Sequence, residues 1–123
     1  MAIVVVLVCL VAASCGGTGS PPTTPALPSN PNTVTLTAAG VAPKELTVAP
    51  GTRVMFMNKD SRRHDMTSDP HPEHSDCPAI NAVGLLSPGQ NRETGNLVEV
   101  RQCGFHDHDN PDNASLKGRI VVR

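Results

Sequence analysis

The chain has 123 residues, a formal net charge of −1, and only two residues with large aromatic rings, Phe56 and Phe105. A nearly neutral chain offers no strongly basic surface for nucleic acid or acidic lipid, and the lack of Trp and Tyr removes the rings on which single-stranded bases stack. The length fits one domain of ordinary size, which excludes a large multidomain enzyme.

The first 43 residues carry no charged side chain, since every Lys, Arg, Asp and Glu lies at or beyond Lys44. Residues 3–13 form an apolar run of 11 residues, which is too short to span a bilayer but suits a signal-peptide core. Small residues before Cys15 resemble a bacterial lipobox. We therefore predict a lipoprotein signal over 1–14 and a lipid on Cys15 that anchors the protein to a bacterial membrane, facing the periplasm or the cell exterior. No Lys or Arg precedes the run, and a buried strand or helix is the alternative.

Residues 15–32 are rich in Pro, Gly, Ser and Thr, and five of the 12 prolines lie here. Such a segment buries too little apolar surface to offset the entropy of ordering it, so we predict a disordered tether. The folded domain is then expected over 33–123. Its exported location implies an oxidising compartment.

From Thr33 onward, short apolar/polar alternations are separated by Pro, Gly and Asn, a pattern typical of β-strands. Strands are predicted over 33–37, 45–49, 52–58, 96–102 and 118–123. The stretch 61–95 is expected to be loop-rich, with room for one short helix or strand. Several short strands in about 90 residues predict an all-β domain, an antiparallel β-sandwich whose loops carry the chemistry.

All five histidines fall in two groups, each following a predicted strand. The first group is His64, His71 and His74, and the second is His106 and His108, shortly after Cys103. Because neighbouring strands of a sandwich end at the same pole, an imidazole from the first group is expected to meet the thiolate and an imidazole of the second. A thiolate with two imidazoles selects copper. Each group alone is equally typical of a solvated polar loop.

The segment from 41 to 122 resembles the cupredoxins, the family of blue copper proteins that includes plastocyanin and the phytocyanins. The resemblance rests on 42–60 (APKELTVAPGTRVMFMNKD), on His64, on the Cys-x-x-His of Cys103 and His106, and on 116–122 (LKGRIVV). It implies a Greek-key β-sandwich and a copper ion held by His64, Cys103 and either His106 or His108. His71 and His74 then belong to the surface near the site.

The fourth, axial ligand departs from the family pattern. Leu116 stands where cupredoxins often have Met, and leucine cannot coordinate a metal. A three-ligand site without the axial sulfur favours Cu(I) and raises the reduction potential. Met66, two residues after His64, is the auxiliary candidate.

Two of the four cysteines remain once Cys9 is removed with the signal and Cys15 carries a lipid, and two thiols in an oxidising compartment favour a disulfide. Closing the 26-residue separation of Cys77 and Cys103 stabilises a fold by about 3–4 kcal/mol, but it removes the thiolate that a blue copper site needs. Phytocyanins have a cysteine in a place similar to that of Cys77, but pair it with an additional cysteine. Both states of Cys103 stay open. With the disulfide, His64, His106, His108 and Met66 remain as donors for an imidazole-rich copper site.

Three functions follow from these patterns. The leading hypothesis is copper binding with single-electron transfer outside the cytoplasm, to a redox partner or a copper-handling protein. The alternatives are copper sequestration or delivery by a His-rich site, and a metal-free β-sandwich held by a Cys77–Cys103 disulfide. No Gly-x-Ser-x-Gly, HExxH or phosphate-binding Gly loop is present, so we expect neither an enzyme nor a nucleic-acid-binding protein.

Overall fold

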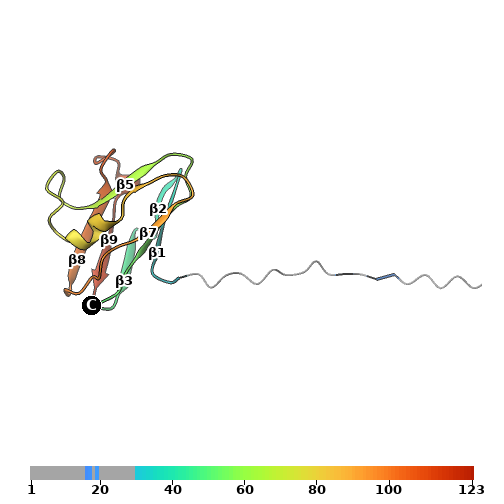
Figure 1. Cartoon of the computed structure of the whole chain (residues 1–123), viewed down its shortest axis with the longest axis horizontal. Coiled ribbons are helices and arrows are strands. Elements are labelled where there is room, and N and C mark those ends of the chain that lie inside the picture. Colours follow the sequence, from blue (N-terminus) through green and yellow to red (C-terminus); the bar gives the residue numbers. More distant parts are fainter. Residues whose placement is uncertain (1–15, 18, 20–29) are drawn as a thin grey trace, which may run out of the picture.

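The computed structural model describes residues 16, 17, 19 and 30–123 (Figure 1). The predicted signal over 1–14, the lipidation site Cys15 and most of the tether over 15–32 lie outside the described residues. In the part that is described, no helix has the length and apolar character needed to cross a membrane. The first strand begins at Thr33.

Two sheets account for the strands in the described residues. The four-stranded sheet has the order β2–β1–β4–β7, with β1 at Thr33–Thr37, β2 at Gly40–Ala42, β4 at Met55–Asn58 and β7 at Asn91–Glu93. The five-stranded sheet has the order β3–β9–β8–β5–β6, with β3 at Glu45–Val48, β5 at His64–Ser68, β6 at Gly84–Leu86, β8 at Arg101–Asp107 and β9 at Gly118–Val122. Two 3₁₀ helices, η1 at Pro78–Ala82 and η2 at Ala114–Leu116, lie in the connections.

The hydrophobic core lies between the two sheets. Alternate residues of the strands point into it, as the period of two in the sequence predicts, and Phe56 of β4 meets Phe105 of β8 edge to face with ring centroids 5.1 Å apart. The predicted all-β sandwich is confirmed, with one difference. Each sheet contains a parallel pair, β1 with β4 and β3 with β9, because the long connections between these strands pass through the other sheet and allow a parallel return.

The strand predicted over 96–102 is wrong in its position. The observed strand β8 runs from Arg101 to Asp107, and the two valines expected in the core, Val98 and Val100, are 63% and 72% exposed. Burial explains the shift, because Cys103, Phe105 and Asp107 occupy the core face instead. Sheet pairing therefore continues through residues expected to form a loop.

The stretch 61–95 is also more ordered than its sequence suggests. It contains β5, η1, β6 and β7, and His64 is the first residue of β5 rather than part of a loop. In β5, His64, Met66 and Ser68 face the core, while Asp65 and Thr67 lie on the outer face. The pairing of Thr67 with His106 of β8 places His106 on that outer face too.

Candidate metal centre

Four of the five histidines lie together on the outer face of the five-stranded sheet. His106 comes from β8, His108 follows the end of that strand, and His71 and His74 come from the loop after β5. One ring nitrogen from each of His71, His74 and His106 lies within 4.8 Å of the other two. His108 joins them, since its Nδ1 is 3.0 Å from Nε2 of His74. We call these four residues the histidine cluster.

The spacing suits a metal ion. Bond lengths of about 2.0–2.1 Å place two imidazole nitrogens on one ion about 2.9–3.3 Å apart. The His74–His108 separation of 3.0 Å lies in that range, but it is a hydrogen bond between the two ring nitrogens that a bound ion would replace. The wider spacing of the other nitrogens, up to 4.8 Å, would require the exposed His71 and His108 to rotate toward the buried His106 before all four rings share one ion.

Two imidazoles of the cluster are oriented by oxygen acceptors. The Nδ1–H of His106 donates to Asp69 Oδ1 over 2.6 Å, and the Nδ1–H of His74 donates to the carbonyl of Ser68 over 2.9 Å. A hydrogen bond from Nδ1 fixes the tautomer and leaves the lone pair on Nε2. Such partners behind the ring are typical of metal-binding histidines.

The backbone at His74 is strained. Its φ of 52° is the only positive φ at a non-glycine residue in the described part of the chain, and such a conformation costs about 1–3 kcal/mol. Three hydrogen bonds hold His74 in this conformation. Its amide donates to the Pro70 carbonyl, its ring donates to the Ser68 carbonyl, and the His74 carbonyl accepts from Asn81 Nδ2. Strain of this kind is concentrated at functional sites.

The protonation state of His71 suits metal binding. Desolvation lowers the pKa of His71, and the neighbouring imidazoles of His108, His106 and His74 lower it further, against an opposing effect of Asp112. His71 is therefore neutral at pH 7 and offers a lone pair. An open cleft of about 570 Å³, lined by His71, His106, Asp69 and Asp112 among others, adjoins the cluster and gives access to it.

His64 lies on the opposite, core face of the sheet, between two carboxylates. Its Nε2 is 3.0 Å from Asp60 Oδ2 and its Nδ1 is 2.8 Å from Asp107 Oδ2. His64 and Asp107 are at most 1% exposed, and Asp60 is 6% exposed. Both ring nitrogens thus face carboxylate oxygens inside the core, so neither is directed toward an open metal position in this arrangement.

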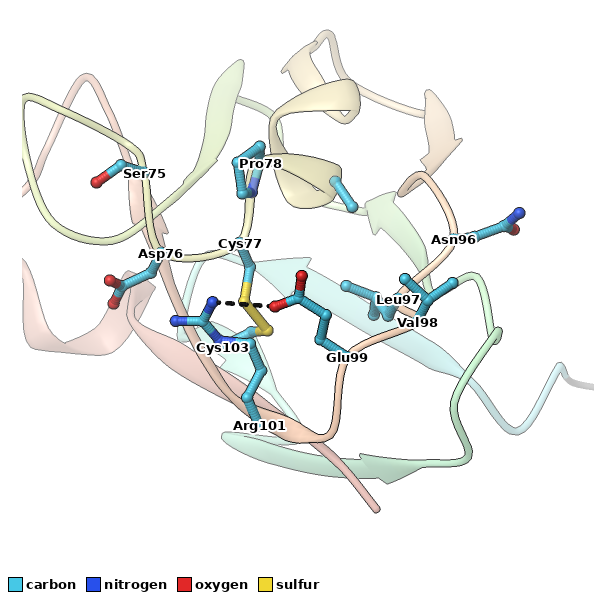
Figure 2. Close-up of a pocket in the computed structure, with 11 residues that line it drawn as sticks. Ser75, Asp76, Cys77, Pro78, Asn96, Leu97, Val98, Glu99, Arg101 and Cys103 are labelled. Atoms are coloured by element: carbon cyan, nitrogen blue, oxygen red, sulfur yellow. Dashed lines mark hydrogen bonds and ion pairs between the residues drawn. A yellow bond between two sulfur atoms is a disulfide. The ribbon is translucent and has the colours of Figure 1, made fainter.

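Cys103 is bonded to Cys77, with the two Cα atoms 5.6 Å apart (Figure 2). Of the two states left open by the sequence, the structure has the disulfide. Cys77 lies just before η1 and fills the space beyond the end of β5, beside β8. Neither sulfur is free as a thiolate.

Comparison with solved structures identifies the architecture. The similar structures include a purple cupredoxin from Nitrosopumilus maritimus (19% identity, 74% of this chain and 98% of that chain, TM-score 0.58). They also include a reduced amicyanin mutant (17%, 74% and 80%, TM-score 0.60) and a mutant fern plastocyanin (19%, 74% and 99%, TM-score 0.56). The chain has the cupredoxin fold. No protein-family model and no curated protein sequence matches it.

Within this cupredoxin fold the ligand set implied by the resemblance is not assembled. His64 and His106 lie on opposite faces of the sheet, and Cys103 lies four residues, or about 13 Å, from the end of β8 that His64 contacts. The core-facing residue beside His64 is Asp107. The structure therefore does not bring His64 and Cys103 together with either His106 or His108, and the physical reason is the extension of β8 through 103–107.

The auxiliary candidates also lie away from the cluster. Met66 faces the core and is fully buried, and Leu116 belongs to η2 and is 2% exposed. The sequence left open whether His106 or His108 is the second imidazole ligand, and the structure brings both into the histidine cluster. His71 and His74, assigned to the nearby surface by the sequence, are the partners that complete the group.

Three residues that support these sites were missed by the sequence reasoning. Asp69 and Asp107 each accept a hydrogen bond from a histidine, and Gly104 lies under Asp69, where a Cβ would overlap the carboxylate. The alternation of Cys103, Phe105 and Asp107 was the available signal for Asp107. The roles of Asp69 and Gly104 depend on the path of the loop after β5, and no pattern in a single sequence indicates that path.

Acid should weaken the fold through Asp60. Burial opposes its ionisation, but hydrogen bonds from His64, Arg62 and the Ser61 amide outweigh burial and lower its pKa from 3.8 to about 2. A carboxyl group with a lower pKa in the folded state contributes stability above pH 4 that is lost as the pH falls toward 2. We expect the difference in urea midpoint between the native chain and Asp60→Asn to shrink over this range. Parallel midpoint curves would contradict this account.

Proposed function

We propose that this domain is an extracytoplasmic copper-binding protein that holds or delivers copper through His71, His74, His106 and His108. The observation that carries the proposal is the convergence of four imidazoles, two of which are oriented from behind by Asp69 and by the Ser68 carbonyl. This corresponds to the alternative function predicted from the sequence, a His-rich copper site, rather than to a blue copper centre.

Two considerations favour copper over other ions. Imidazole donors bind divalent ions of the first transition series in an order that peaks at Cu²⁺. Copper is also the ion named in a similar structure, a Cu(I) amicyanin mutant. When bound, copper supplies a Lewis acid and a one-electron couple, whereas the chain supplies neutral nitrogen donors and a cleft through which ligands exchange.

The geometry favours exchange of the ion over electron transfer in a rigid site. His74 and His106 are held by oxygen acceptors, but His71 and His108 are exposed. An ion with two solvent-exposed ligands is accessible to the ligands of another protein, so the partner we propose is a copper-handling protein. The Cys77–Cys103 disulfide supports an oxidising, extracytoplasmic location. We propose no catalytic activity.

A copper titration with optical and electron paramagnetic resonance spectra tests this function. We expect one Cu(II) per chain with weak visible absorption from nitrogen ligands, and binding that survives Cys103→Ser. An intense red absorption band that is lost in Cys103→Ser would instead establish a thiolate site. Absence of any copper binding would contradict the proposed function and favour the metal-free β-sandwich held by the disulfide.

Gly104 provides a selective test of the orientation of His106. A Cβ at this position overlaps only the movable carboxylate of Asp69, so Gly104→Ala should fold normally but displace Asp69 from His106. Loss of such a partner behind a ligand typically lowers metal affinity by about 10–100-fold.

The matched control is the same substitution in an Asp69→Ala background. Because the two changes act through one hydrogen bond, Gly104→Ala should have no further effect on Cu(II) affinity once Asp69 is absent. Two additive losses would show that Gly104 acts on the site by another route.

A further inference from the structure

The Cys77–Cys103 disulfide closes the loop that carries half of the histidine cluster. Cys77 follows His74 by three residues, and Cys103 precedes His106 by three residues. We infer that this disulfide is a redox-active modification site, open to a dithiol protein, and that its reduction loosens the histidine cluster and releases the metal. The inference rests on the proposed copper site.

The loop has few other attachments at its far end. The Cys77 amide donates to Ser68 Oγ over 2.8 Å, and the Asp76 amide donates to the Asp69 carbonyl over 2.9 Å. Both bonds return to the end of β5. The disulfide is the covalent link between the loop and β8, the strand that holds His106. Without it, His71 and His74 are positioned relative to His106 by hydrogen bonds alone, chiefly those of His74 to the Pro70 and Ser68 carbonyls and of the Asp69 amide to the Gly104 carbonyl of β8. We infer that these bonds hold the loop less tightly than the disulfide does.

The disulfide is reachable from solvent. It forms part of the wall of a pocket of about 320 Å³, which is also lined by Pro78, Leu97 and Val98 (Figure 2). Cys77 is 5% exposed and Cys103 is 1% exposed, so Cys77 is the more accessible half. The partly apolar walls of this pocket suit an extended peptide segment that bears a cysteine and reaches the largely buried Cys77 from the pocket.

A cation lies in the same pocket. Arg101 lines it, and its Nη1 is 3.5 Å from Glu99 Oε2. Positive charge beside a cysteine favours the thiolate over the thiol. The carboxylates of Glu99 and Asp76 line the pocket as well and oppose this effect. A thiol of lower pKa leaves a disulfide faster, so we infer that Arg101 assists the departure of a sulfur and that its contribution is several-fold at most.

The reaction balances with a protein dithiol as the reductant. Its first thiolate attacks Cys77 Sγ, a mixed disulfide forms, and Cys103 departs as a thiolate that Arg101 stabilises. The second thiol of the partner, after losing its proton, then attacks the partner sulfur of the mixed disulfide and releases Cys77. Two electrons and two protons pass in total from the dithiol to the chain, and the partner becomes a disulfide.

Linkage makes the effect reciprocal. If the disulfide raises metal affinity tenfold, the bound metal must make the disulfide tenfold harder to reduce. For this two-electron couple a tenfold change is about 30 mV in reduction potential. Metal and disulfide thus stabilise each other, and reduction delivers the ion.

The first experiment compares Zn(II) affinity in the full chain and in its Cys77→Ala/Cys103→Ala variant, because Zn(II) does not oxidise thiols and the alanines offer no new ligand. We expect at least a tenfold loss. The same pair is then measured with His71→Ala/His74→Ala added, where the disulfide should no longer matter because the loop holds no ligand.

These outcomes separate the inference from the proposed function. If the intact chain binds neither Zn(II) nor Cu(II), the proposed function fails. If it binds them and the double alanine variant binds equally well, the inference alone is overturned. A loss that persists without the two loop histidines also overturns it, because the disulfide then acts through general stability.

A second experiment uses the unmutated cysteines and remains informative if the alanine variant does not fold. The reduction midpoint of the disulfide is measured in a thiol redox buffer too weak to remove the metal, with and without saturating Zn(II). We expect a midpoint at least about 30 mV more negative with metal. Reduction should be several-fold slower in Arg101→Gln than in Arg101→Lys, with unchanged metal affinity. An unshifted midpoint or equal rates would contradict the inference.

Discussion

Replacing His106 with alanine should weaken Cu(II) binding by more than about 100-fold, beyond the loss expected for any partner behind a ligand. His106 is the buried member of the histidine cluster, at 1% exposure, and its ring is fixed by Asp69. The substitution removes both the donor and its orientation. Competition with a chelator of known affinity measures the loss.

His71→Ala should lower Cu(II) affinity less, by about tenfold, because an exposed imidazole is replaced by water more easily.

His64 provides the matched control for this prediction. Its two ring nitrogens are engaged by Asp60 and Asp107 on the core face, so His64→Gln should leave Cu(II) affinity within about twofold in chains that remain folded. Circular dichroism verifies folding, since the chain has no Trp or Tyr for fluorescence. Loss of binding in a folded His64→Gln chain, with binding retained in His106→Ala, would contradict the proposed site.

The sheet architecture could be predicted because it follows from a local pattern. Alternating apolar residues over 33–37 and 118–123 correspond closely to β1 and β9, since a period of two is dictated by the strand itself. The segment 96–102 has the same alternation, yet its valines are exposed. Alternation shows that a segment has an apolar face and a polar face, but it does not show whether the rest of the fold covers the apolar face.

Prediction of the site depended on where β8 ends and on its register in the sheet, which a single sequence does not specify. Identifying Cys103 and His64 as partners required β8 to end near residue 102, whereas it continues to Asp107. A shift of this size changes both the neighbours and the faces of the histidines. The convergence of histidines from the two groups was predictable, but the identity and number of the imidazoles that meet were not. The path of the loop from Asp69 to Asp76 determines that grouping, through bonds to backbone carbonyls such as that of Ser68.

Removing the carboxylate of Asp107 should cause the largest loss of stability among the polar residues of the core. This fully buried group meets His64 Nδ1 and accepts hydrogen bonds from the amides of Asp65 and Asp109 and from Asn110. Asp107→Ala leaves an imidazole and two amides without an acceptor, which costs about 3–5 kcal/mol. For a domain of this size the melting temperature should fall by roughly 15–30 °C, measured with a chelator present.

Two comparisons show whether this loss comes from the buried pair. Asp112→Ala, at an exposed position, should change stability by less than about 0.5 kcal/mol. The double variant His64→Leu/Asp107→Ala should lose about 1–3 kcal/mol less than the sum of its single variants, because the imidazole that Asp107→Ala leaves unpaired is then absent. Additive losses would mean that Asp107 acts mainly through the backbone amides of Asp65 and Asp109, and not through His64.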